Sequence, residues 1–187
     1  MRRVWLYVIS AVLILGAATA IIAAMGDSKD HSQSPAPATS QSVAFPQRKA
    51  CSIFSLADAK QVLGDSAKGG SNNPDSPEDL DVSACSYTQD AGSNVPVSGH
   101  KSASLLVRAP KSGAGTTSNQ NQFGRLKPAD SQPVTGYGDN AYWDPQYGQL
   151  NILKHNSWYI LSNGPITPSE RTLDQAETLA DILINKL

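Results

Sequence analysis

The feature that most constrains this chain is an uncharged, largely apolar run near its N-terminus, residues 4–25. A helix of 22 residues spans roughly 33 Å, about the thickness of the hydrocarbon core of a bilayer. Arg2 and Arg3 precede the run, whereas the first charge after it is Asp27. The positive-inside rule then leaves residues 1–3 as a cytoplasmic stub and places the rest of the chain outside the cytoplasm. We therefore expect a single-pass signal-anchor in the cell membrane.

The alternative to an anchor is a cleaved signal peptide, which would leave the protein secreted. Residues 18–20 read Ala-Thr-Ala, which could serve as a small-residue cleavage site, but the apolar run continues through residues 21–25. The sequence also lacks the cysteine that a lipoprotein carries directly after its apolar core. The uncleaved anchor is the interpretation that we favour, with the membrane as a partner through this helix.

The segment after the anchor, residues 26–50, is rich in Ser, Pro, Ala and Gln and has little to bury. Such a segment cannot offset its ordering entropy, so we expect a disordered tether that holds a folded domain, residues 51–187, away from the membrane. After residue 25 the chain carries 13 basic and 16 acidic residues, a formal charge of −3. Nucleic-acid binding needs a concentrated basic surface, and this composition excludes it.

The patterns in residues 51–187 predict an α+β domain. Ser55 and Asp58 form a capping box for a helix that Gly64 ends. Thr167 and Glu170 predict a second capping box, opening a C-terminal amphipathic helix with a proline in its first turn. Strands are expected at residues 84–88, 102–108, 141–143, 149–153 and 158–161, the last three as an antiparallel meander. Surface loops are expected at residues 65–82 and 89–101, and a weak helix at residues 117–126. The predicted fold is an antiparallel sheet with the N-terminal and C-terminal helices packed on it.

Cys51 and Cys85 are the two cysteines of the chain, and both fall in the part expected outside the membrane, where disulfides persist. A bond between them closes a loop of 34 residues and constrains the unfolded chain by about 3–4 kcal/mol. We predict a disulfide. The rival interpretation, two free thiols in a reactive or metal site, lacks partner ligands nearby in the sequence.

Two stretches resemble a family of cell-envelope proteins of unknown function, most of them actinobacterial lipoproteins. Residues 51–64, Cys-Ser-Ile-Phe-Ser-Leu-Ala-Asp-Ala-Lys-Gln-Val-Leu-Gly, and the later Cys-Ser-Tyr at residue 85 resemble that family's Cys-x-Leu-Leu-Thr-x-x-Glu-Ala, Leu-Gly and Cys-x-Trp/Tyr pattern. Residues 134–143 resemble its Val-x-Gly-Leu-Gly-Asp-x-Ala-Tyr/Trp segment. The resemblance covers most of residues 51–187 and implies a PsbP-like α/β/α sandwich, with a membrane helix in place of the lipid-modified cysteine. It implies no particular activity.

No catalytic constellation stands out in the sequence. A Gly-x-Ser-x-Gly elbow is absent, and the two histidines of the domain, His100 and His155, fall in an expected loop and turn. An acidic cluster in the first loop lacks the order of a calcium-binding EF-hand loop. Its members are Asp75, Glu78, Asp79 and Asp81. The glycine-rich residues 111–117 lack the Gly-Lys-Ser/Thr of a phosphate loop. We predict no catalytic residue, no metal site and no cofactor.

The most distinctive segment is Gly-Tyr-Gly-Asp-Asn at residues 136–140. Two glycines predict a tight turn, with Asp139 capping that turn through its own backbone. A functional interpretation makes the turn the rim of an aromatic-lined pocket. The pocket would be lined by Tyr137, Tyr142, Trp143, Tyr147 and Trp158. Aromatic residues equally form the core of a sheet, which is the default interpretation for Trp143 and Trp158.

These patterns make a noncatalytic binding or interaction module on the outer face of the cytoplasmic membrane the leading hypothesis. Its ligand would be an envelope lipid, a small molecule or another envelope protein. One alternative is a hydrolase of envelope material whose site assembles only in space, which requires a buried histidine–carboxylate pair in a cleft. The other is a structural subunit of an envelope complex, which requires an exposed apolar patch and no pocket.

Overall fold

The computed structural model describes residues 45, 47–71, 76–90 and 99–187. The expected cytoplasmic stub, membrane span and most of the tether therefore lie outside the described residues. Among the residues that are described, no helix is both long enough and apolar enough to cross a membrane. The architecture below is that of one compact unit, Ser42–Leu187.

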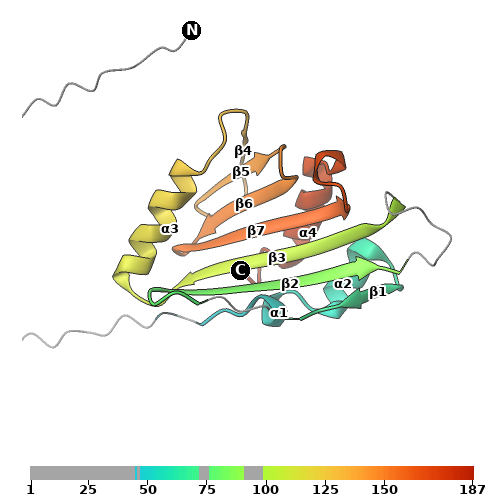
Figure 1. Ribbon diagram of the computed structural model, residues 1–187, viewed down its shortest axis with the longest axis horizontal. Coiled ribbons are helices and arrows are strands. Elements are labelled where there is room, and N and C mark those ends of the chain that lie inside the picture. Colours follow the sequence, from blue (N-terminus) through green and yellow to red (C-terminus); the bar gives the residue numbers. More distant parts are fainter. Residues whose placement is uncertain (1–44, 46, 72–75, 91–98) are drawn as a thin grey trace, which may run out of the picture. The chain divides into compact units, whose positions relative to one another are not determined.

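A seven-stranded antiparallel sheet forms the centre of this unit, in the order β1-β2-β3-β7-β6-β5-β4 (Figure 1). The strands are β1 (Ala67–Gly69), β2 (Leu80–Gln89), β3 (Lys101–Pro110), β4 (Gln132–Val134), β5 (Asn140–Asp144), β6 (Gln149–Lys154) and β7 (Ser157–Pro165). Every adjacent pair is antiparallel. The expected α+β class is confirmed, as is the meander of β5, β6 and β7.

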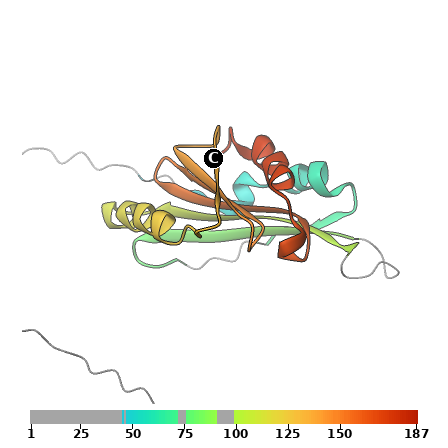
Figure 2. The same ribbon diagram turned by 90° about the horizontal axis from the view of Figure 1, so that it is seen from above.

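The helices divide unequally between the two faces of the sheet. They are α1 (Ala50–Ile53), α2 (Leu56–Leu63), α3 (Gly113–Arg125), the 3-10 turn η2 (Pro168–Glu170) and α4 (Leu173–Leu183). Figure 2 shows α1, α2 and α4 together on one side of the sheet. Phe123 of α3 instead packs on Tyr142 and Trp158, whose neighbours Trp143 and Tyr159 face the main core. Because successive strand residues point to opposite faces, α3 lies on the other side.

Burial along β3 shows how differently the two faces are covered. Its residues Ala103, Leu105 and Val107 are completely buried beneath the three helices. The alternate residues Ser104 and Leu106 are only partly buried. One face of the sheet is therefore a closed core, whereas α3 is the one helix among the described elements that covers part of the other face. This asymmetry positions the candidate site.

The capping box of α2 is confirmed, but that of α4 lies elsewhere than the sequence predicts. Ser55 and Asp58 cap α2 as expected. In α4 the cap is Thr172, whose hydroxyl accepts from the backbone N–H of Gln175 while the Gln175 side chain accepts from the N–H of Thr172. Thr167 opens only the short η2 and makes no side-chain cap. Arg171 is extended and donates to the carbonyls of residues 165 and 166, so it ends η2 and separates the two turns.

The expected loop at residues 65–82 is wrong at both ends, because β1 forms at Ala67–Gly69 and β2 begins at Leu80. Asp81 and Ser83 are polar and yet buried on the covered face. The Asp81 carboxylate pairs with Lys49, and the Ser83 hydroxyl accepts from the backbone N–H of Ala50 at 2.9 Å. These partners come from a distant part of the chain. Because the sequence does not show them, the polar residues at the start of β2 led to the prediction of a loop.

Helix α3 is longer than the weak helix expected at residues 117–126. It begins at Gly113, and the hydroxyl of Ser112 caps it by accepting from the N–H of Gly115. A Cβ atom at Gly115 would overlap the carbonyl oxygen of Asp79. The glycine therefore permits the close approach that holds the first turn of α3 against the start of β2.

Candidate functional site

The two cysteines form a disulfide, as predicted, between Cys51 in α1 and Cys85 in β2. Their Cα atoms are 5.0 Å apart, and Cys85 is completely buried. The bond joins the first helix to the covered face of the sheet. Since both sulfur atoms are used, the reactive-thiol and metal interpretations of this pair do not apply.

The five aromatic residues expected to line one pocket are distributed over both faces of the sheet. Trp143 lies in the main core, and Tyr137 packs at its margin, where its hydroxyl donates to Asp181 at 2.8 Å. Tyr142 and Trp158 lie on the other face beneath α3. Tyr147 is 54% exposed on the β5–β6 turn. The structure therefore brings together only Tyr142, Tyr147 and Trp158.

Tyr137 and Tyr142 remain protonated hydrogen-bond donors at neutral pH. Burial raises the pKa of Tyr142 to about 12, with a smaller contribution from the charge of Asp144. Burial also raises the pKa of Tyr137, and the hydrogen bond and charge of Asp181 raise it further. Neither phenol can act as a base at physiological pH.

Asp139 caps a different turn from the one that the sequence predicts. Its carboxylate accepts from the backbone N–H of His155 at 2.9 Å, and its own N–H donates to the carbonyl of Leu153. His155 and Asn156 form the β6–β7 turn with positive φ angles, 50° and 64°. This left-handed turn contains no glycine, and the carboxylate of the neighbouring strand supports it. The depression around Asp139 is formed by consecutive residues of the β4–β5 connection, 133–141.

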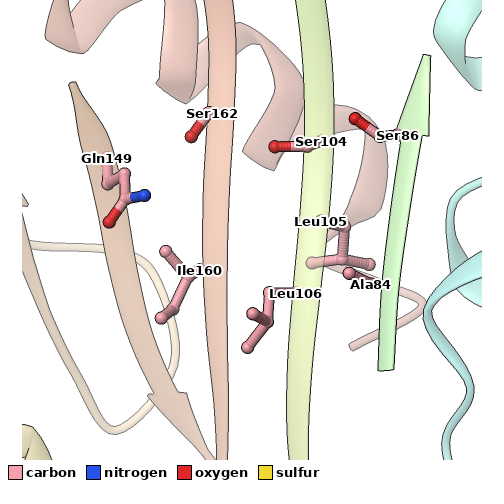
Figure 3. Close-up of a pocket in the computed structure, with 8 residues that line it drawn as sticks. All are labelled: Ala84, Ser86, Ser104, Leu105, Leu106, Gln149, Ile160 and Ser162. Atoms are coloured by element: carbon pink, nitrogen blue, oxygen red, sulfur yellow. The ribbon is translucent and has the colours of Figure 1, made fainter. Parts of the chain in front are cut away.

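A shallow depression of about 250 Å³ lies on the uncovered part of the sheet (Figure 3). It is lined by Ala84, Ser86, Ser104, Leu105, Leu106, Gln149, Ile160 and Ser162. Strand register arranges six of these residues in two rows that cross the sheet, whereas the side chain of Leu105 belongs to the core on the covered face. Ser104 is opposite both Ser86 and Ser162, and Leu106 is opposite both Ala84 and Ile160. No side-chain hydrogen bond joins these three serine hydroxyls to another described residue, and Ser162 is only 4% exposed.

A second depression, of about 330 Å³, adjoins the first and shares Gln149 and Ile160 with it. Its other lining residues are Leu126, Tyr142, Asp144, Tyr147, Asn151 and Trp158. Leu126 and Tyr147 are each 54% exposed, unusually high for large apolar side chains. We call the surface made by these two adjoining depressions the open sheet face.

The turn that carries Tyr147 is held firmly although its ring is exposed. The carboxylate of Asp144 accepts from the backbone N–H of Gln146 at 3.0 Å and from that of Tyr147 at 3.2 Å. Gly148 has a φ of 57°, and a Cβ atom there would overlap the carbonyl oxygen of Pro168. The backbone of Tyr147 is thus fixed from both sides, which lowers the entropic cost of a contact made by its ring.

Helix α3 forms a fixed wall along one side of the open sheet face. Its completely buried Asn119 donates to the carbonyls of Arg108 and Asn156, at 2.7 and 2.9 Å. Arg108 donates in return to the side-chain oxygen of Asn119 and also to that of Gln122, and it lies 5.2 Å from the ring centroid of Trp158. Burial lowers the pKa of Arg108, which nevertheless stays charged at neutral pH.

The histidines and the acidic cluster of the first expected loop do not converge on this surface. His155 is exposed in its turn and contacts Asp139 through its backbone, and neither it nor His100 lines any of the three depressions described above. Asp79 accepts from Ser112, and Asp75 lies outside the described residues. In the part of the chain that the structure describes, no three His, Cys, Asp or Glu side chains are placed to hold a metal.

The sequence did not point to the serines or to Gln149, because their importance depends on which face of the sheet stays uncovered. Alternation in residues 102–108 shows that Ser102 and Ser104 share a face, but not that α3 stops short of them. Comparison with known proteins adds nothing further: no family model, curated protein or solved structure significantly matches this chain. The fold and the open sheet face together define a small α+β domain with a half-covered antiparallel sheet.

Proposed function

We propose that this protein is a noncatalytic binding domain of the bacterial cell envelope and that the open sheet face is its binding surface. Residues 4–25 anchor it in the cytoplasmic membrane and residues 26–50 hold it away from the bilayer. A sandwich of the PsbP-like type, with helices on both faces of one antiparallel sheet, is the fold that we propose for the wider family. The observation that carries the proposal is the half-covered sheet, where unpartnered polar groups adjoin apolar side chains and a rigidly held tyrosine.

The chemistry of this surface favours binding over hydrolysis. A serine nucleophile needs an adjacent base, and no histidine or lysine is among the lining residues of the open sheet face. Tyr142, with a pKa near 12, cannot supply that base. An envelope scaffold would instead present a broad apolar patch. The large apolar residues exposed in the described ranges are Leu56, Leu126, Tyr147 and Ile166, of which two border the open sheet face.

Native mass spectrometry of the full chain, purified from the membranes of its own host, tests the proposal. We expect a bound adduct of small-molecule size. Ser104→Leu, which fills the centre of the first depression, should abolish the adduct. Ser66→Leu should retain it, because Ser66 is exposed beside β1 at the edge of the sheet. The proposal is contradicted if the adduct survives Ser104→Leu. It is also contradicted if the protein carries no adduct and host envelope extract does not protect β3, β6 and β7 from hydrogen exchange.

A further inference from the structure

The ligand chemistry of the open sheet face follows from its lining residues. We infer that this face binds a neutral oligosaccharide laid across the strands, an inference that rests on the proposed function. The first depression is lined by three serines, of which Ser162 is nearly buried at its floor, and by Gln149, beside the apolar Leu106 and Ile160. Hydroxyls and amides both donate and accept hydrogen bonds, which matches the mixed donors and acceptors of sugar hydroxyls. The apolar row matches the C–H faces of sugar rings.

Charge argues against an anionic ligand such as a phosphate or a phospholipid headgroup. Among the lining residues of the two depressions, Asp144 alone is charged, and one of its oxygens already accepts two backbone N–H groups. Lys127 and Arg108 contact the rings of Tyr142 and Trp158 but line neither depression. An anion bound here would lose hydration without gaining a cationic partner.

Depth and polarity argue against a lipid acyl chain. An acyl chain is stabilised by apolar surface that encloses it, whereas the first depression is open and has a volume of about 250 Å³. Burying the hydroxyls of Ser86, Ser104 and Ser162 under a hydrocarbon would leave them without partners. The same hydroxyls are satisfied by a ligand that carries its own hydrogen-bonding groups.

The spacing of the polar groups fits a chain of sugar rings. Ser86, Ser104 and Ser162 are opposite one another on three adjacent strands, so they recur about every 5 Å across the sheet. This interval is close to the length of one pyranose ring. Figure 3 shows Gln149 of β6 beyond Ser162 of β7, which continues the polar row by one more strand. A linear oligosaccharide crossing the strands would place about one ring over each strand.

Tyr147 supplies the stacking surface at the end of this row. Its ring is 54% exposed, it lines the second depression, and Gln149 joins that depression to the serine row. The electron-rich face of an aromatic ring attracts the slightly positive C–H groups on one face of a sugar ring. Because Asp144 and Gly148 fix its turn, little backbone order is lost when a sugar stacks on it.

The test uses the full chain in lipid nanodiscs, which are free of sugar detergents, and three neutral probes. The probes are cellotetraose, maltotetraose and tetra-N-acetylchitotetraose. Saturation-transfer NMR measures contact with each sugar. We expect at least one probe to bind, and both Tyr147→Ala and Ser104→Leu to weaken its binding by about tenfold or more. Leu56→Ala, which removes a comparably exposed side chain from α2, should leave binding unchanged.

The remaining outcomes separate this inference from the proposed function. If no sugar binds, but phosphatidylglycerol vesicles or host extract protect β3, β6 and β7 from hydrogen exchange, the oligosaccharide is overturned and the binding surface stands. If a sugar binds with equal strength to wild type, Tyr147→Ala and Ser104→Leu, the open sheet face is not its site and the inference fails. If neither sugars, vesicles nor extract affect this face, both proposals are overturned.

Discussion

Buried polar side chains in this domain act as partners for main-chain groups and for charges brought from distant parts of the chain. Asp58 is 5% exposed and accepts from the backbone N–H and the hydroxyl of Ser55 and from Lys186. Burial alone would raise the pKa of Asp58, but the hydrogen bonds from Lys186 and Ser55 outweigh it and hold the pKa below 3.8. One carboxylate thus ties the start of α2 to the C-terminal end of the domain.

This depressed pKa predicts a specific acid sensitivity. A group whose pKa is lower in the folded state stabilises the fold above its unfolded-state value of 3.8, and this contribution is lost as pH falls through the folded-state pKa. Asp58→Asn should therefore lower the unfolding free energy by about 1 kcal/mol at pH 7, with a smaller difference from wild type at pH 3. Urea denaturation between pH 3 and pH 7 measures both. Asp90→Asn, in an exposed pair with Lys68, is the control, and an equal pH dependence in both variants would contradict the assignment.

At the scale of single elements, the helix caps show where sequence patterns suffice and where they do not. The box at Ser55 is readable from sequence because an apolar helical pattern follows it directly. Near the C-terminus the sequence predicts a box at Thr167, whereas the structure has it five residues later, at Thr172. Arg171 lies between the two threonines and donates to the carbonyls of Pro165 and Ile166, and its bond to the hydroxyl of Ser102 in β3 is a tertiary contact that no local pattern shows.

The two threonines provide a matched test of the cap. Thr172→Ala removes the hydroxyl that accepts from Gln175 and should lower the unfolding free energy by about 1 kcal/mol. Thr167→Ala removes a hydroxyl that caps nothing and should change it by less than about 0.5 kcal/mol. Chemical denaturation of both variants measures the difference. Equal losses, or a larger loss for Thr167, would show that the helix begins where the sequence alone suggests.

Helix α3 contains a second matched pair, because its glycines Gly115 and Gly124 have opposite surroundings. A Cβ at Gly115 meets the carbonyl of Asp79, whereas a Cβ at Gly124 meets nothing within 4 Å. Gly124→Ala should stabilise the domain by about 0.5–1 kcal/mol, since alanine loses less backbone entropy in a helix. Gly115→Ala should destabilise it by about 1–3 kcal/mol, since the first turn must move away from β2. Thermal unfolding checks both signs, and a stabilising Gly115→Ala would rule out the close approach.

At the scale of the whole molecule, the predictable part is the closed core and the unpredictable part is the open sheet face. The meander and the amphipathic α4 can be predicted from the spacing of apolar residues along the sequence. The disulfide can be predicted because the chain has two cysteines. The candidate site depends instead on four strands meeting in one register and on α3 covering only part of them. Tyr142 and Trp143 are adjacent and yet lie on opposite faces. A cluster of aromatics in the sequence therefore cannot be equated with one pocket.

At the scale of the whole molecule, the Cys51–Cys85 bond also connects the location of the chain with its stability, because a disulfide persists only in an oxidising compartment. The proposed export through residues 4–25 would place both thiols where a disulfide persists. The bond stabilises the domain by about 3–4 kcal/mol for a sequence separation of 34. We expect the full chain to stay in the membrane pellet after an alkaline wash, with both cysteines protected from a maleimide–polyethylene glycol reagent. A chain that starts at Gly26 should stay in the cytoplasm with both cysteines modified. Released full chain with protected cysteines would indicate secretion instead, and modified cysteines in the full chain would contradict the proposed export.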